Sequence, residues 1–193
     1  RIDRMTTKSQ EVVRAAVDAA SRRGNPEVLP EHLLIAVLEQ EGGVGGPLVQ
    51  KAGGDPGRIS QELLRHVESL PRVTGGAEPQ LSRRGLHVLQ RAEDQAKALR
   101  DDFVSVEHLL LAAVQHDDKT KAVFQAHDLG YERLLAALAS VRGSQRITDR
   151  DPEGKFQALE KYTRDLTADA RQCKLAPVIG RDEETRRVTQ ALS

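Results

Sequence analysis

The segment Glu31-His32-Leu33-Leu34 recurs as Glu107-His108-Leu109-Leu110, at an offset of 76 residues (107 − 31). The match continues on both sides of the two segments, with a slip of one residue at its downstream end. The further matching pairs are Thr6 with Ser82, Lys8 with Arg84, Val12-Val13 with Val88-Leu89, and Leu48-Val49-Gln50 with Val123-Phe124-Gln125. A match of this length indicates that one structural unit was duplicated, and it predicts a pseudo-twofold module over residues 1–142.

Composition is typical of a soluble globular chain. The 193 residues are 38% hydrophobic and 30% charged, which is enough for one full domain and an appendage. Aromatic residues make up 3% and Trp is absent, so we expect a core of Leu, Val, Ile and Ala packed between helices. Basic and acidic residues both number 29, a balance that argues against a general nucleic-acid-binding protein.

Three further features exclude other classes of protein. Cys173 is the only cysteine, so no disulfide can form within the chain. The sequence holds no apolar stretch of about 20 residues, the length that a membrane-spanning helix needs. The charged start Arg1-Ile2-Asp3-Arg4 lacks the apolar region of a secretory signal. We therefore expect a cytoplasmic protein without membrane association.

Apolar residues recur at helical spacing along almost the whole chain, which predicts an all-α fold. We expect repeats at about residues 6–71 and 82–142, each with about four helices, joined by a flexible stretch at 72–81. The expected helices cover 7–22, a segment opened by Pro30, 48–52, 56–69, segments capped by Ser82 and Ser105, 119–127 and 131–142. Thr7-x-x-Gln10 predicts a capping box at the first helix.

The helix after Ser82 is expected to turn one apolar face inward. That face consists of Leu86, Leu89, Ala92, Ala96 and Leu99. Beyond the second repeat, residues 143–155 have almost no apolar content and predict an exposed, flexible linker. Residues 156–193 then resume a helical pattern and resemble the entrance to a further domain.

Candidate catalytic and metal-binding residues are few. His32 and His108 each follow a Glu, but neither has a second ligand at helical spacing, so we interpret both as polar groups at helix starts. The glycine-rich stretch 42–46 lacks the Lys-Ser/Thr of a phosphate-binding loop and is interpreted as a helix connector. Cys173 has no His or Asp near it in sequence, which argues against a nucleophile.

Asp101, Asp102 and Glu107 bracket a turn and a helix start, and two interpretations are open from their spacing. Acidic residues commonly occupy helix N-termini, where they interact favourably with free N–H groups and the helix dipole. Alternatively, these acids line the rim of an apolar groove and receive polar or basic groups of a bound peptide.

With its duplication and its tail, the chain resembles the ClpB-type protein disaggregases of the Clp family of AAA+ ATPases. The doubled helical unit is similar to the Clp N-terminal domain. Residues 141–144 and 158–167 resemble the linker and lead-in helix of that subfamily, and the segment from Pro177 to Arg187 resembles the opening of the first ATPase domain.

The resemblance implies a function and a set of site residues. The full-length protein would be a hexameric, ATP- and Mg-dependent unfoldase that works with a DnaK-type chaperone on unfolded or aggregated polypeptides. Its N-terminal domain would dock those substrates. By the match of motifs, Thr6, Asp101 and Glu107 would take part in substrate handling, beside an apolar groove with Leu86 and Leu89. Val178 and Ile179 would pack around adenine.

Two departures from the family pattern stand out. Ala176 occupies the position before Pro177 where the family carries Asp. The sequence also contains no Walker A, Walker B or arginine-finger motif, so we expect no ATP hydrolysis by these 193 residues alone and no bound cofactor or metal. Two rival functions stay open: docking of a folded adaptor for a Clp protease, and regulation of the motor by packing against it.

Overall fold

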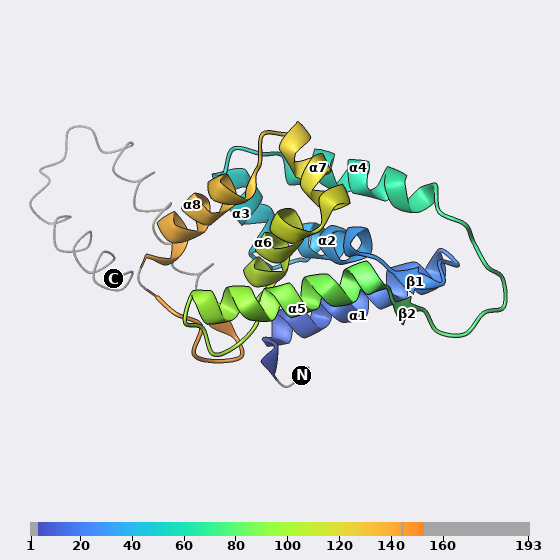
Figure 1. Ribbon diagram of the computed structural model, residues 1–193, viewed down its shortest axis with the longest axis horizontal. Coiled ribbons are helices and arrows are strands. Elements are labelled where there is room, and N and C mark those ends of the chain that lie inside the picture. The colour runs from blue at the N-terminus through green and yellow to red at the C-terminus, as the bar shows by residue number, and fades with distance from the viewer. Residues whose placement is uncertain (1–3, 144, 153–193) are drawn as a thin grey trace, which may run out of the picture.

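The computed structural model describes residues 4–143 and 145–152, which form eight helices and one pair of short strands. The helices are α1 (Thr7–Arg22), α2 (Pro30–Glu39), α3 (Gly45–Lys51), α4 (Pro56–Glu68), α5 (Arg83–Ala98), α6 (Val106–His116), α7 (Asp118–Ala126) and α8 (Tyr131–Arg142). The strands are β1 (Glu27–Val28) and β2 (Gln80–Leu81). Figure 1 shows α2 and α6 at the centre, with α1 and α5 along one side and α4 and α7 along the other. The predicted all-α fold is confirmed.

Two backbone pairings link the repeats at equivalent positions. Val28 pairs with Leu81 in the parallel β1–β2 ladder. Met5 pairs with Val104 in an isolated parallel bridge. At the offset of 76 residues, Met5 is equivalent to Leu81 and Val28 is equivalent to Val104. The two pairings are therefore related by the pseudo-twofold symmetry of the repeats. The predicted pseudo-twofold arrangement is confirmed, and the structure adds that the start of each repeat pairs with the other repeat.

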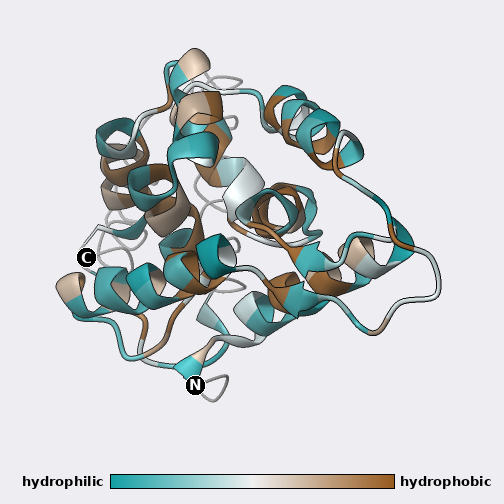
Figure 2. Cartoon of the chain, turned by 45° about the vertical axis from the view of Figure 1, so that its right-hand side comes forward, coloured by the Kyte–Doolittle hydropathy of each residue, from teal (hydrophilic) through white to brown (hydrophobic). Residues whose placement is uncertain are grey.

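The core is built almost entirely from aliphatic side chains, as the composition predicts. Helix α6 is buried along most of its length, from Val106 to Val114. The largest fully buried side chains, three of them from α6 itself, include Phe124, Leu33, Leu34, Ile59, Leu63, Leu109, Leu110, Leu111, Leu129 and Leu134. Figure 2 shows hydrophobic residues on the inward faces of the helices. Within the described part of the chain, none of the helices is both long enough and apolar enough to cross a membrane.

Two details of the helix starts differ from the sequence prediction. Thr6, rather than Thr7, caps α1, because its hydroxyl oxygen accepts a hydrogen bond from the N–H of Ser9 at 3.2 Å. The side chain of Gln10 donates to the Met5 carbonyl instead of closing a capping box. Helix α3 begins at Gly45, earlier than expected, because this glycine packs against α2. A Cβ at position 45 would lie 2.6 Å from the Val37 carbonyl oxygen.

Candidate functional site

An apolar groove of about 290 Å³ lies between α1 and α5. Its lining residues are Met5, Val13, Leu81, Leu86, Leu89, Gln90, Glu93 and Val104. Leu86 is 47% exposed and Leu81 is 38% exposed. Leu89 is half-buried and packs against the core. The structure therefore brings Leu86 and Leu89 together in one groove, whereas the expectation that Leu86 turns into the core is wrong. A half-exposed leucine on a concave apolar surface is a typical contact point for an apolar ligand.

Both backbone pairings between the repeats place residues in the lining of this groove. Leu81 comes from β2, while Met5 and Val104 come from the isolated bridge. Gly85 lets α5 approach the strands closely, since a Cβ there would lie 2.8 Å from the Leu81 side chain and 2.9 Å from the Val28 carbonyl oxygen. The groove is thus a product of the duplication, because its lining combines residues of both repeats.

Thr6 lies behind the groove rather than in its lining. Thr6 is fully buried, and its N–H donates to the Val104 carbonyl at 2.9 Å. The hydroxyl of Thr6 donates to the Ser9 hydroxyl at 3.1 Å while capping α1. Because Thr6 follows Met5 and bonds to Val104, it holds two lining residues of the groove in place.

Asp101 is also an internal residue, with a side chain that is 0% exposed. One carboxylate oxygen lies 2.7 Å from His108 Nε2 and 2.7 Å from a guanidinium nitrogen of Arg142. The other oxygen accepts a hydrogen bond from the N–H of Ile147 at 2.8 Å. Burial alone would raise the pKa of Asp101, but the hydrogen bonds from His108, Ile147 and Arg142 hold it below its usual value.

The geometry fixes the protonation of His108. Its Nδ1 accepts a hydrogen bond from the Ser105 N–H at 2.8 Å, and a backbone N–H can only donate. His108 is therefore neutral, and its Nε2–H donates to the Asp101 carboxylate. In the first repeat, His32 Nδ1 accepts from the Leu29 N–H at 2.9 Å in the same way. Both histidines complete helix starts, as the sequence interpretation predicts.

The two repeats differ in the acceptor that faces the histidine. His32 Nε2 lies 3.0 Å from the side-chain oxygen of Asn25, which corresponds to Asp101 at the offset of 76. Burial lowers the pKa of His32, against a raising effect of Glu31 and with a smaller lowering effect of Arg23. A neutral histidine needs only one acceptor, so the amide of Asn25 suffices in the first repeat.

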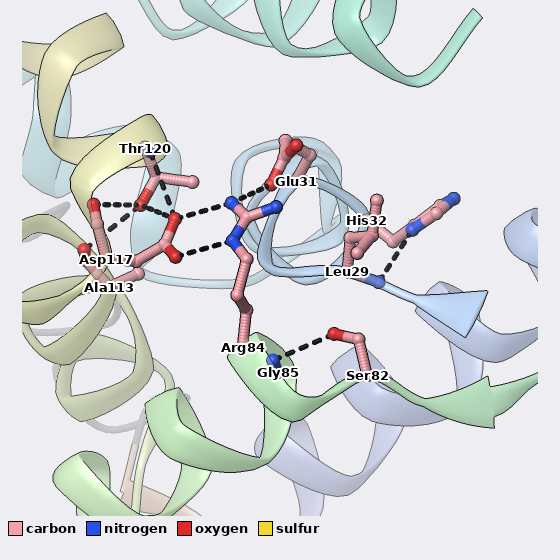
Figure 3. Close-up of polar contacts among 9 residues, drawn as sticks. All are labelled: Leu29, Glu31, His32, Ser82, Arg84, Gly85, Ala113, Asp117 and Thr120. Carbon is pink, nitrogen blue, oxygen red and sulfur yellow. Dashed lines mark hydrogen bonds and ion pairs between the residues drawn. The ribbon is translucent and has the colours of Figure 1, made fainter. Parts of the chain in front are cut away.

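Glu107 has a side chain that is 2% exposed, and one of its carboxylate oxygens lies 3.9 Å from a guanidinium nitrogen of Arg142. Its counterpart Glu31 is held more tightly, at 2.6 Å from Arg84, which also bonds both carboxylate oxygens of Asp117. Figure 3 shows Arg84 reaching from α5 between these two acids, so the cluster joins the first repeat to the second. This inter-repeat cluster is a structural element that spacing alone does not reveal.

The expectation that Asp101 and Glu107 line an exposed rim is wrong, because both carboxylates are buried among partners from their own chain. The polar side chains that line the groove are those of Gln90 and Glu93, which sequence reasoning missed. Their positions on α5, one helical turn from Leu86 and Leu89, are the pattern that could have indicated them.

No group of three or more His, Cys, Asp or Glu residues suited to a metal ion occurs within residues 4–143 and 145–152. Val178, Ile179, Ala176 and Cys173 lie outside the described residues, as does the expected lead-in segment 156–193. Their predicted roles stay predictions.

Comparison with known proteins identifies the family of this fold. The family model described as the Clp repeat (R) N-terminal domain matches residues 4–127. The chain belongs to the Clp N-terminal domain family. The match includes the groove, Thr6, Asp101 and Glu107, so these features lie within the part of the chain that the Clp domain covers.

Two further comparisons agree with a Clp N-terminal domain. The chaperone protein ClpB of Mycobacterium tuberculosis (strain ATCC 25618 / H37Rv) is 44% identical over 189 residues, which are 97% of this chain and 22% of that protein. The chain thus spans about a fifth of the length of such relatives. The crystal structure of the Hsp104 N-terminal domain from Candida albicans has a TM-score of 0.69 and 25% identity, covering 77% of this chain and 98% of that one.

A complex of a ClpV N-domain with VipB peptide shares the fold of this Clp domain. Its TM-score is 0.61 at 21% identity, and the alignment covers 76% of this chain and 92% of that one.

Proposed function

We propose that this chain is the substrate-docking module of a ClpB-type, ATP-dependent chaperone, and that it binds exposed apolar stretches of unfolded or aggregated polypeptides. The observation that carries the proposal is the α1–α5 groove, in which Leu86 and Leu81 are partly exposed beside a continuous apolar lining. Similarity to ClpB chaperones over nearly the whole chain supports the same function.

The proposed binding is driven by apolar contact. Leu86 and Leu89 form the contact surface, and the few polar groups of the lining, Gln90 and Glu93, leave room for charged or amide groups of the bound chain. Covering one half-exposed leucine contributes only about 1 kcal/mol. We expect a single shallow groove to bind weakly, at about tens of micromolar, which corresponds to roughly −6 kcal/mol, so the rest of the lining must contribute most of the binding energy. A hexamer would gain affinity through several such sites acting on one polypeptide.

Thr6, Asp101 and Glu107 act in this proposal from behind the groove. Thr6 bonds to Val104 and directly follows Met5, and both of these residues line the groove. Asp101 and Glu107 lie on either side of Val104 in the sequence, and both approach Arg142. The Asp101 carboxylate also bonds to His108 and to the N–H of Ile147, behind the turn that carries Val104. We therefore assign them support of the binding surface rather than direct contact with substrate.

In the full-length protein, we propose ATP hydrolysis with Mg²⁺ by AAA+ domains beyond this chain, assembly as a hexamer and cooperation with a DnaK-type chaperone in the cytoplasm. Val178 and Ile179 would contact adenine there. The present 193 residues would dock substrate without turning over ATP.

Fluorescence anisotropy of a labelled, permanently unfolded polypeptide tests the docking proposal. We expect saturable binding that persists at high salt and weakens at least fivefold in Leu86→Asp. Val73→Asp is the matched control, because Val73 is 51% exposed and lies in the loop between α4 and β2, outside the groove. Equal affinity of the Leu86 and Val73 variants, or preference for a folded adaptor over the unfolded polypeptide, would contradict the proposal.

A further inference from the structure

The segment 145–152, expected from its polar composition to be an exposed linker, packs back onto the helical domain. Ile147, the third residue of this segment, is 0% exposed. Its neighbour Thr148 is exposed. The expected exposure of the whole segment is therefore wrong at Ile147 and at Pro152, which is also buried, because a few apolar side chains among polar ones can anchor a short segment on a core.

Two backbone–backbone hydrogen bonds and one bond from a backbone N–H to a side chain hold the segment. The N–H of Ile147 donates to the Asp101 carboxylate at 2.8 Å, and the N–H of Asp102 donates to the Ile147 carbonyl at 2.8 Å. At the other end, the N–H of Thr7 donates to the Arg150 carbonyl at 2.9 Å. The Arg150 guanidinium also lies 5.6 Å from the centre of the Phe103 ring.

The first repeat cannot make the same attachment. Asn25 replaces Asp101 there, and its single side-chain oxygen already faces His32. Pro26 replaces Asp102 and has no N–H to donate. The second repeat thus differs from the first in two groups that bind the segment 145–152. Asp101 supplies a second carboxylate oxygen as an acceptor, and Asp102 supplies a backbone N–H as a donor.

We propose that the turn 101–103 and the start of α1 form an intramolecular docking surface for the segment 145–152, and that Asp101 is the positioning residue of this surface. One oxygen of its carboxylate accepts a hydrogen bond from His108, and the other accepts one from the N–H of Ile147. Asp101 thereby attaches the segment 145–152 to the interior of the second repeat.

The docked segment sets how far the domain can reach from whatever follows it in the chain. Eight residues released from the surface would add at most roughly 29 Å of extended chain between the domain and the rest of the protein. When the segment is docked, the connection to the following residues is short and leaves the domain beside Thr7. When the segment is released, that connection is longer. Val104 follows this docking turn and lines the groove, so both sites share one short stretch of backbone.

Hydrogen exchange of the 193-residue chain tests the docking surface. In Ile147→Asp, the buried position would receive a charge, and we expect the amides of Thr7 and Asp102 to exchange at least tenfold faster while the melting temperature stays within a few degrees. Thr148→Asp places the same charge on the exposed neighbour and should leave both amides protected. Unchanged protection in Ile147→Asp would overturn the proposal.

Asp101→Asn tests the positioning role without emptying the site. An amide offers one acceptor oxygen, as Asn25 does, so it serves either His108 or Ile147 but not both. We expect the protection of Ile147 and Asp102 to fall about tenfold while the melting temperature shows that the domain is still folded. Lost affinity with intact protection would show instead that Asp101 acts on the groove. The Leu86→Asp result is independent of either outcome, so the two proposals fail separately.

Discussion

Arg84, at the start of the second repeat, lies 2.6 Å from Glu31 of the first repeat and binds Asp117 through two nitrogens. Both carboxylates are almost completely buried, at 4% and 6% exposure, whereas the arginine side chain is 30% exposed. The cluster therefore joins the repeats through charges that have little access to water, and its loss would leave two buried acids without their cation.

Replacing this arginine should destabilise the domain. We expect Arg84→Gln to lower the free energy of unfolding by about 2 kcal/mol, because two buried carboxylates lose their charged partner. Arg91→Gln is the control on the same helix, since Arg91 pairs with Asp94 at the surface, where both side chains are at least 40% exposed. The control should change stability by less than about 0.5 kcal/mol. Urea denaturation of both variants measures the difference, and equal effects would refute a structural role for the cluster.

Asp117 should make stability depend on acid. Burial alone would raise the pKa of Asp117, but hydrogen bonds from Arg84 and Thr120 hold it below the ordinary 3.8. The charged carboxylate therefore stabilises the fold fully above pH 3.8, and this contribution is lost as the pH falls toward the lower folded-state value. We expect Asp117→Asn to be clearly less stable than the parent at pH 7, and the gap to narrow below pH 3.8. A gap that stays constant with pH would contradict this assignment.

His32 predicts a second pH effect, nearer to neutrality. Burial holds its pKa below the ordinary 6.5, so the unfolded chain takes up a proton before the folded one does. Stability should then be complete above pH 6.5 and decline as the pH falls below it. His32→Gln should remove part of that decline, whereas His66→Gln removes an exposed histidine and should not. Thermal melting between pH 8 and pH 5 compares the three proteins.

Gly85 should resist substitution by any residue with a side chain. A Cβ there would lie 2.9 Å from the Val28 carbonyl oxygen, so α5 or β1 must shift. We expect Gly85→Ala to cost about 1–3 kcal/mol and to weaken polypeptide binding, because Leu81 of the groove is displaced as well. Gly76→Ala serves as the control, since a Cβ at that position meets nothing within 4 Å. A fully stable Gly85→Ala protein would show that the close approach is not needed.

Much of the fold follows from local patterns in the sequence. The helical spacing of apolar residues predicted all eight described helices, because an amphipathic helix needs its apolar face every third or fourth residue whatever it packs against. The strands β1 and β2 were missed, since two residues are too few to show an alternating pattern. Their partner is also distant in sequence: Glu27 pairs with Gln80.

The candidate site depended more heavily on tertiary structure. The sequence named Leu86 and Leu89, and the structure brings both to one groove. It could not show that the acids beside them are buried, because a carboxylate near a helix start looks the same whether it meets solvent or a distant partner. Arg142 and Ile147, which contact Asp101, are 41 (142 − 101) and 46 (147 − 101) residues away along the chain.

The sequence by itself determined the duplication, the helices and the apolar surface that each helix must cover, because these depend on the order of residues over short distances. The tertiary structure alone decided which charges became partners across the repeats, where the groove opens and where the segment 145–152 docks. Those features depend on which distant residues meet when the two copies interlock: Met5 with Val104, and Val28 with Leu81.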